Sequence, residues 1–135
     1  MIIRKKGSFE AAHMLPDYEG ACNNLHGHSY TYELEIDSDV NPITGMVLDF
    51  NVIKKIISTY DHSLLISDYN YRDEAEQELH DWAKRYGKAV NVIQDGKATA
   101  ENIARDIGLK FQMMRCAGRI SLKETGSSEV VYKWS

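Results

Sequence analysis

A strictly alternating segment in the first third of the chain limits the possible folds more than any other feature. Apolar residues occupy every second position there and polar residues lie between them; the apolar residues are Tyr30, Tyr32, Leu34 and Ile36. Alternation with a period of two is typical of a β-strand that has one buried face. The sequence therefore predicts an antiparallel sheet with one face covered.

Three further segments can supply the partner strands. Residues 2–13 alternate in part and lead into a loop that contains Pro16. Two short segments, residues 118–123 and 129–134, close the chain, and Gly126 lies in the turn between them. Together with the alternating segment they predict four strands.

Helical periodicity occupies the remaining parts of the chain. Asp49 is expected to cap a helix that begins at Phe50. A second pattern runs from about Arg72 to Tyr86, and a third from Thr99 to Met114. Strands and helices come in blocks, which favours an α+β domain with helices packed on one face of the sheet. Without a linker or a repeat, residues 1–135 are expected to form a single domain.

Composition excludes several classes of function. The net charge of −4 argues against a general nucleic-acid or membrane surface. No apolar run approaches the roughly 20 residues that span a bilayer, and the amino-terminal apolar stretch is too short for a signal peptide. Two cysteines in 135 residues do not make a disulfide framework. We therefore expect a soluble cytoplasmic protein that acts on a small molecule.

The densest chemistry lies around two histidines separated by one residue. His26 and His28 would lie on the same face of a strand, so both imidazoles could reach one ion. His13 ends the first predicted strand and can supply a third ligand. Three histidines with an open fourth position are typical of catalytic zinc. Two alternatives stay open. A single H-x-H pattern is often only polar surface sequence. Cys22 could also be a fourth ligand, in which case it would block the position that substrate needs.

Five other polar residues are candidates for the same site. Cys22 lies in a polar loop beside the proposed cation, a setting that favours a reactive thiol, although most free cysteines are buried and inert. Asp61 could fix the tautomer of His62 and so make it a competent base. The carboxylates of Glu101 and Glu124 could each accept two N–H bonds from a heterocycle such as a pterin. Their alternatives are a helix-dipole charge for Glu101 and an exposed strand-end charge for Glu124.

These residues belong to a series of short motifs that runs through most of the chain. The motifs are Phe9-Glu10-Ala11-Ala12-His13, Cys22 with His26-Gly27-His28, Gly45 to Phe50, Asp61-His62, Thr99 to Asn102, and Lys123-Glu124-Thr125. In this order and spacing the chain resembles 6-pyruvoyltetrahydropterin synthase and its bacterial relative, 6-carboxytetrahydropterin synthase of queuosine biosynthesis.

The resemblance implies a fold and an assembly. The fold would be the tunnelling fold (T-fold), a four-stranded antiparallel sheet with helices on one face. Subunits would form trimers that stack into homohexamers, with active sites at the subunit interfaces.

The resemblance also implies roles for individual residues. His13, His26 and His28 match the zinc ligands, and Cys22 matches the cysteine that transfers protons. Asp61 and His62 match its partners, which come from a neighbouring subunit. By the same resemblance, Glu124 anchors the pterin ring and Glu101 is a second acid in that pocket.

The implied reaction converts 7,8-dihydroneopterin triphosphate into 6-carboxytetrahydropterin, acetaldehyde and triphosphate. Three residues separate Cys22 from His26, which favours the carboxy branch over 6-pyruvoyltetrahydropterin synthase. A non-catalytic zinc- or pterin-binding relative is an alternative of another class, and an unrelated zinc hydrolase is disfavoured because no H-E-x-x-H motif is present. Residues 68–92 depart from the pattern, since the resemblance does not account for their helix.

Overall fold

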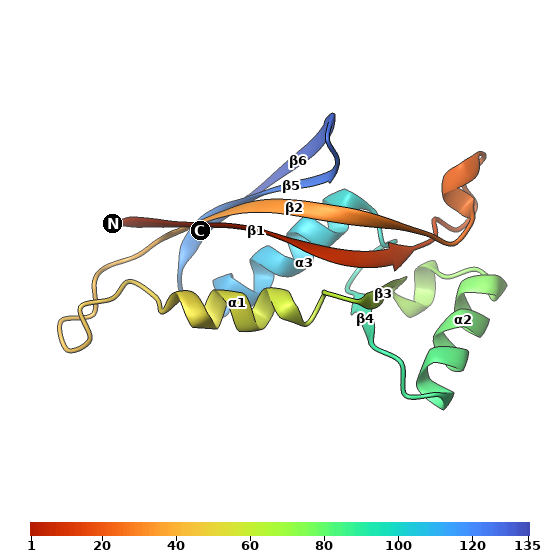
Figure 1. The fold of residues 1–135 in the computed structure, drawn as a ribbon, viewed down its shortest axis with the longest axis horizontal. Coiled ribbons are helices and arrows are strands. Elements are labelled where there is room, and N and C mark those ends of the chain that lie inside the picture. The colour runs from red at the N-terminus through yellow and green to blue at the C-terminus, as the bar shows by residue number, and fades with distance from the viewer.

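Four antiparallel strands form the larger part of a single sheet in the computed structural model, which describes all 135 residues (Figure 1). They are β1 (Ile2–His13), β2 (His26–Asp37), β5 (Ala117–Thr125) and β6 (Ser128–Trp134). β1 pairs with β2, β2 with β5, and β5 with β6. All four strands were predicted, and β2 is longer than its alternating segment because it begins at His26.

Two additional strands make the sheet mixed rather than purely antiparallel, so the expectation of four strands was wrong. β3 (Ser63–Ser67) pairs in parallel with β1, and β4 (Val90–Ile93) pairs in parallel with β3, which gives the order β4-β3-β1-β2-β5-β6. β3 is buried on both faces and therefore reads as a short continuous apolar run without alternation. Such a run gives no period by which a strand can be recognised.

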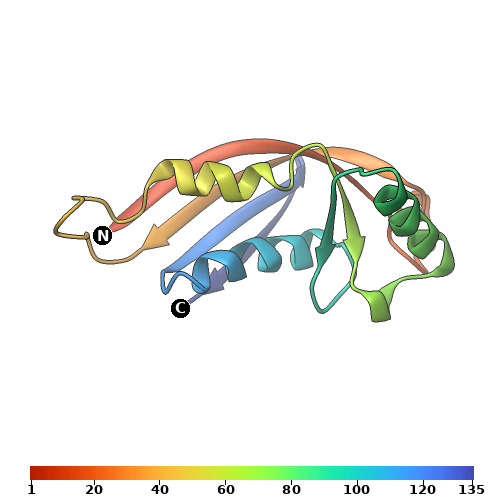
Figure 2. The ribbon, with the colours of Figure 1, turned by 90° about the horizontal axis from the view of Figure 1, so that it is seen from below.

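Helices α1 (Phe50–Ser58) and α3 (Ala100–Gln112) cover one face of the sheet (Figure 2). Asp49 caps α1 as predicted, because its side chain accepts a hydrogen bond from the Asn51 amide at 2.8 Å. Thr99 caps α3 in the same way through the Asn102 amide. Two single 3₁₀ turns, η1 (Ala21–Asn23) and η2 (Tyr69–Tyr71), complete the local structure. No helix has both the length and the apolar character needed to cross a membrane.

Helix α2 (Glu74–Arg85) differs from the other two helices, because it packs outside the main core against β3 and β4 (Figure 1). Leu65 points into the core, whereas its neighbour Ile66 is fully buried outside the core, as is Ala83 of α2. Successive side chains of a strand point to opposite faces. α2 therefore lies on the opposite side of β3, and the expectation of helices on one face holds for α1 and α3 only.

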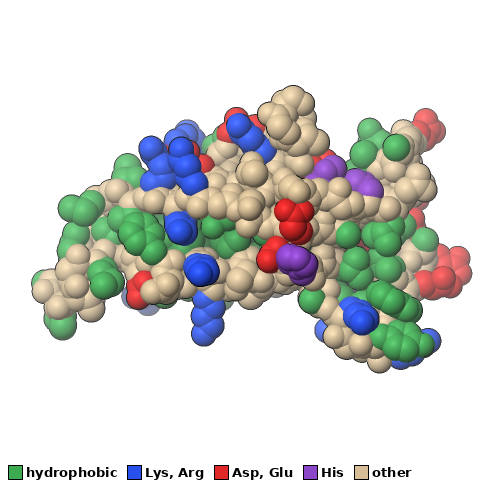
Figure 3. Space-filling model, in the orientation of Figure 1, with side chains coloured by type: hydrophobic (Ala, Val, Ile, Leu, Met, Phe, Trp, Pro, Cys, Tyr) green, Lys and Arg blue, Asp and Glu red, His purple; other side chains and the backbone are tan.

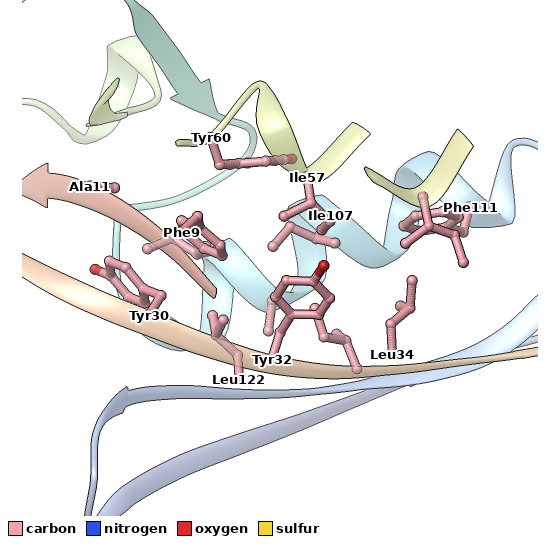
Figure 4. Close-up of a cluster of buried hydrophobic side chains, with 14 of the residues drawn as sticks. Phe9, Ala11, Tyr30, Tyr32, Leu34, Ile57, Tyr60, Ile107, Phe111 and Leu122 are labelled. Atoms are coloured by element: carbon pink, nitrogen blue, oxygen red, sulfur yellow. The ribbon is translucent and has the colours of Figure 1, made fainter. Parts of the chain in front are cut away.

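The core between the sheet and helices α1 and α3 contains aromatic and branched aliphatic side chains (Figure 4). Phe9 of β1 stacks on Tyr30 of β2 with ring centroids 5.0 Å apart. Tyr60 is completely buried, and its hydroxyl donates to Asp106 of α3 at 2.6 Å. This packing fixes β1 and β2 against each other close to the ends that carry the histidines.

A carboxylate on the opposite face of the sheet is held by two arginines. Arg119 donates to both oxygens of Glu35, through Nε at 2.6 Å and through a terminal nitrogen at 3.0 Å, and Arg4 also donates to Glu35. These hydrogen bonds, with Arg119 first, lower the pKa of Glu35 from 4.5 to about 2. The carboxylate therefore stabilises the fold fully above about pH 4.5, and this contribution is lost as the pH falls towards 2.

We expect Glu35→Gln to flatten the acid side of the stability profile. The free energy of unfolding, measured by urea titration between pH 6 and pH 2, should fall less steeply in this variant than in the wild-type protein. Glu78→Gln, a change at an exposed position of α2, is the control and should keep the wild-type slope. Equal slopes for Glu35→Gln and the wild type would show that the arginine pairs do not stabilise the folded state.

Candidate metal centre

The pairing of β1 with β2 brings three histidines together. His13 lies directly opposite His26 in the register, and His28 lies two residues further along β2 on the same face. One nitrogen from each ring forms a group in which all three atoms lie within 4.8 Å of one another. His13 is 1% exposed, and His26 and His28 are half-buried. The three predicted ligands therefore form a cluster that could hold a metal ion.

Backbone carbonyls orient two of the three rings. His13 donates from Nδ1 to the carbonyl of Ala98 at 2.6 Å, and His26 donates from Nδ1 to the carbonyl of Asn24 at 2.7 Å. A proton on Nδ1 leaves Nε2 of a neutral imidazole with a free lone pair. Both Nε2 atoms then face the same point, which is the usual arrangement of a histidine that binds a metal.

The contacts between these nitrogens fit a bound cation. Nε2 of His13 and Nε2 of His26 are only 3.1 Å apart, and neither carries a proton in the tautomers described above. Nε2 of His28 is buried and has no hydrogen-bond partner. Burial is the main reason that the pKa values of His13 and His28 lie below the usual range, so both rings favour the neutral form that binds metals. The two unprotonated Nε2 atoms of His13 and His26, with the unpartnered Nε2 of His28 beside them, fit a positive charge between the three rings.

Glu124 brings a negative charge to the edge of the cluster. It lies near the end of β5, with Oε1 3.3 Å from Nε2 of His28 and Oε2 4.0 Å from Nε2 of His13. A carboxylate at this distance favours a cation at the histidines. The structure thus places Glu124 beside the three histidines, within one chain.

Asp61 and His62 form a contact in the turn immediately before β3. Nδ1 of His62 lies 3.0 Å from Oδ2 of Asp61, while Oδ1 of Asp61 accepts a hydrogen bond from the Glu10 amide at 2.8 Å. The Glu10 amide is the main cause of the lowered pKa of Asp61, followed by His62. His62 has a left-handed backbone with φ of 54°, which costs about 1–3 kcal/mol for a residue other than glycine.

The turn conformation of His62 aims its ring away from the chain. The amide of His62 is held by the carbonyl of Glu10 at 2.6 Å, whereas its side chain is 80% exposed. The pair is therefore anchored to β1 through its backbone and through Asp61, and its imidazole is free to meet another molecule.

Cys22 and Glu101 are not joined to the other candidates within the chain. Cys22 is a free, half-buried thiol in η1, and no hydrogen bond connects it to Asp61 or His62. Glu101 is exposed in the first turn of α3 and has no hydrogen bond to Glu124 or to a histidine. One chain thus assembles the three histidines and Glu124, and separately the Asp61–His62 pair.

A broad surface pocket of about 830 Å³ adjoins these groups. His28 and His62 both contribute to its lining, and its apolar wall includes Leu64 of β3 with Leu79 and Trp82 of α2. Figure 3 shows histidine and acidic side chains beside an apolar area on this face of the molecule. Of the cluster, only His28 contributes to this lining, and His13, His26 and Glu124 do not.

A comparison with known protein families shows which family the chain belongs to. The family model of 6-pyruvoyl tetrahydropterin synthase matches residues 2–133. The chain belongs to this family. A relative named 6-carboxy-5,6,7,8-tetrahydropterin synthase from Haemophilus influenzae is 32% identical, and the match covers 97% of each chain. The Bacillus subtilis protein of the same name is 37% identical over 97% of this chain and 84% of its own length.

Comparison with solved structures confirms the fold. The structure of 6-pyruvoyl tetrahydropterin synthase from Caenorhabditis elegans superposes with a TM-score of 0.63 at 23% identity, covering 100% of this chain and 96% of that one. An uncharacterised protein from Wolinella succinogenes gives a TM-score of 0.67 at 18% identity and covers 100% of this chain and 98% of its own. The T-fold expected from the resemblance is therefore confirmed, with the two additional parallel strands described above.

Sequence reasoning missed the groups that hold the histidines of this family member in place. The carbonyls of Asn24 and Ala98 accept the Nδ1 protons of His26 and His13. A backbone carbonyl is common to every residue, so side-chain identity gives no signal for either contact. Ala98 also lies 85 positions from His13, and only the folded chain brings them together.

Proposed function

We propose that the chain is a zinc-dependent 6-carboxy-5,6,7,8-tetrahydropterin synthase. It would convert 7,8-dihydroneopterin triphosphate and one water molecule into 6-carboxytetrahydropterin, acetaldehyde and triphosphate in queuosine and 7-deazaguanine biosynthesis. The observation that carries the proposal is the convergence of three histidine nitrogens in a chain whose full-length curated relatives bear this enzyme's name. The two free thiols agree with a reaction in the reducing cytoplasm.

The metal-binding part of the proposal assigns Zn²⁺ to His13, His26 and His28. Three neutral imidazoles leave a position open for substrate oxygen, as in other catalytic zinc sites. When bound there, zinc would act as a Lewis acid that polarises an oxygen of the pterin side chain and makes the neighbouring C–H more acidic. The Nδ1 hydrogen bonds to Ala98 and Asn24 support this assignment, because they fix the tautomer that zinc requires.

Proton transfer is assigned to Cys22 together with the Asp61–His62 pair. Asp61 holds Nδ1 of His62, so the Nε2 atom of the exposed ring can accept a proton. His62 would activate the thiol of Cys22, which then removes and returns protons on the substrate side chain. Because no contact joins Cys22 to His62 within one chain, the pair is proposed to come from a neighbouring subunit.

Glu124 and Glu101 are proposed to hold the pterin ring. A carboxylate can accept two parallel N–H bonds from the amidine edge of a pterin. The position of Glu124 beside His28 would place such a ring next to the metal. A ring fixed there would direct its side chain at the zinc, and positioning of this kind removes several kcal/mol from a barrier.

We expect Glu124→Gln to weaken substrate binding more than metal binding. The amide offers one acceptor and one donor to two N–H groups, so the KM for 7,8-dihydroneopterin triphosphate should rise at least about tenfold. Zinc content, measured by atomic spectroscopy, should stay near that of the wild type. Glu129→Gln on β6 is the matched control and should leave KM unchanged. An unchanged KM in a variant with the zinc content of the wild type would refute the ring-binding role.

The sheet edges support a homo-oligomer. β1 pairs with β3 only at Ala11 and Ala12, so its outer edge over residues 2–9 is free, and the outer edge of β6 is free at the other side. β1 and β6 run in opposite directions, so β6 of one copy can extend the antiparallel sheet of the next. A closed ring removes all these free edges.

The resemblance sets the ring at three subunits and the assembly at six. The molar mass from light scattering should then be a multiple of three chains. A monomer at micromolar concentration would contradict the assembly and the shared active site.

Identification of the product tests the proposed function. Zinc-loaded protein is incubated with 7,8-dihydroneopterin triphosphate, and the pterin product is identified by mass spectrometry. The proposal predicts 6-carboxytetrahydropterin with one acetaldehyde for each turnover. 6-Pyruvoyltetrahydropterin without acetaldehyde would assign the chain to the other branch, and binding without turnover would identify a non-catalytic relative.

A further inference from the structure

Glu76 of α2 is a buried acid that lies outside the site described above. Its side chain is completely buried, and it comes from residues 68–92, the segment that the family resemblance does not explain. We propose that Glu76 is a positioning residue for the metal centre: through Ser67 and Ala98 it holds His13 in the orientation that presents Nε2 to the metal. This inference rests on the proposed metal-binding role of the three histidines.

A continuous series of buried hydrogen bonds connects Glu76 to the metal centre. Oε2 of Glu76 accepts from the hydroxyl of Ser67 at 3.1 Å and from the Ser67 amide at 3.1 Å. The Ser67 hydroxyl in turn accepts from the Ala98 amide at 3.1 Å. The carbonyl of Ala98 then accepts the Nδ1 proton of His13 at 2.6 Å. Ser67, Glu76 and Ala98 are all 0% exposed, so water does not compete for these bonds.

The direction of these bonds gives Glu76 a definite role. A serine hydroxyl has one proton to donate. Because the Ser67 oxygen accepts from Ala98, and its proton goes to Glu76, the carboxylate sets the orientation in which Ser67 can receive the Ala98 amide. Ala98 lies between β4 and α3 and outside the sheet ladder, so Ser67 supplies its amide with an acceptor.

The free-energy cost of burying the Glu76 side chain argues that it is more than a packing residue. Its second oxygen, Oε1, is buried without a hydrogen-bond partner. A buried polar atom without a partner destabilises the fold. Ala83, on the same helix, shows that an apolar side chain can be buried against β3 and β4 at no such cost. A costly acid at this position is explained by the acceptor that it gives to Ser67.

A purely structural role would make a different prediction from a positioning role. If Glu76 and Ser67 only fasten α2 to β3, their loss lowers the stability of the metal-free protein and leaves zinc affinity unchanged. If they position His13, their loss weakens zinc binding and also reduces the increase in melting temperature that zinc produces. Zinc affinity measured on the folded protein therefore separates the two roles.

The experiment compares four variants in the full-length protein. Ser67→Ala removes the hydroxyl that receives Ala98, and Glu76→Leu removes the acceptor while keeping a similar size. Glu76→Gln keeps an acceptor oxygen and should rescue the function of Glu76. Ser63→Ala is the matched control: it deletes a buried hydroxyl of the same strand that donates to Tyr60 and does not contact Ala98.

Zinc affinity is measured by competition with a chromogenic chelator, and melting temperatures are recorded with and without zinc. Ser67→Ala and Glu76→Leu should bind zinc about tenfold more weakly, as is usual when the outer partners of a histidine ligand are lost. Glu76→Gln and Ser63→Ala should stay within about twofold of the wild type. If Glu76→Leu does not fold, Ser67→Ala decides the question.

Two results would overturn the inference, and they can be distinguished. Wild-type zinc affinity in Ser67→Ala, with a lowered melting temperature of the metal-free protein, would leave only the structural role. Absence of zinc binding by the wild-type protein would overturn the proposed metal centre as well.

Discussion

Replacing Cys22 with alanine is expected to reduce turnover by about 10²–10⁴-fold, the usual contribution of a group that transfers protons. The thiol lies in η1, outside the histidine cluster, and makes no side-chain hydrogen bond. Its loss should therefore leave the fold and the zinc content unchanged. Steady-state turnover of 7,8-dihydroneopterin triphosphate, measured beside zinc content and melting temperature, provides the comparison.

The second cysteine is the matched control for this variant. Cys116 is buried in the core, and its thiol donates a hydrogen bond to the carbonyl of Met114. Cys116→Ala should keep turnover within a few-fold of the wild type. Near-normal activity in Cys22→Ala would rule out Cys22 as the proton-transferring group, and loss of zinc from that variant would indicate that its thiol is a ligand.

Replacing His26 with alanine is expected to abolish zinc binding and, with it, activity. The remaining two imidazoles cannot complete a three-nitrogen site, and Nε2 of His13 would lose the neighbour that lies 3.1 Å away. Zinc content determined by atomic spectroscopy should fall close to zero after dialysis. The increase in melting temperature on adding zinc should also disappear.

A histidine elsewhere in the chain controls for a general effect of removing an imidazole. His80 lies on α2 and contacts Asp81, far along the chain from the cluster and outside it. His80→Ala should keep the zinc content of the wild type. Unchanged zinc in His26→Ala would refute the assignment of the three histidines as ligands.

The sequence predicts those elements of the fold in which apolar residues recur with a clear period. Residues 30–36 alternate strictly, and β2 contains them. Asp49 caps the helix that was predicted to follow it, and Thr99, the predicted first residue of the third helix, is the N-cap of α3. β3 and β4 are short and lack alternation, so local pattern could not distinguish them from loop or helix. The side of β3 on which α2 packs also follows from long-range contacts, which no local period contains.

The candidate site likewise combines features that the sequence pattern predicts with contacts that it does not. The spacing of His26 and His28 on one strand predicted their shared face, and the register of β1 with β2 brought His13 beside them. The hydrogen bonds that orient these rings could not be predicted, because they end on the backbone carbonyls of Asn24 and Ala98. The roles of Cys22, Asp61–His62 and Glu101 stay predictions, since their proposed partners belong to other subunits or to the substrate.

Crystals of the protein grown with zinc provide the most direct test of the central claim, that the three histidines form a zinc site. Anomalous scattering measured at the zinc absorption edge should show one peak per chain, about 2.0–2.1 Å from Nε2 of His13, His26 and His28. A zinc peak at another place, or none between these three nitrogens, would contradict the account.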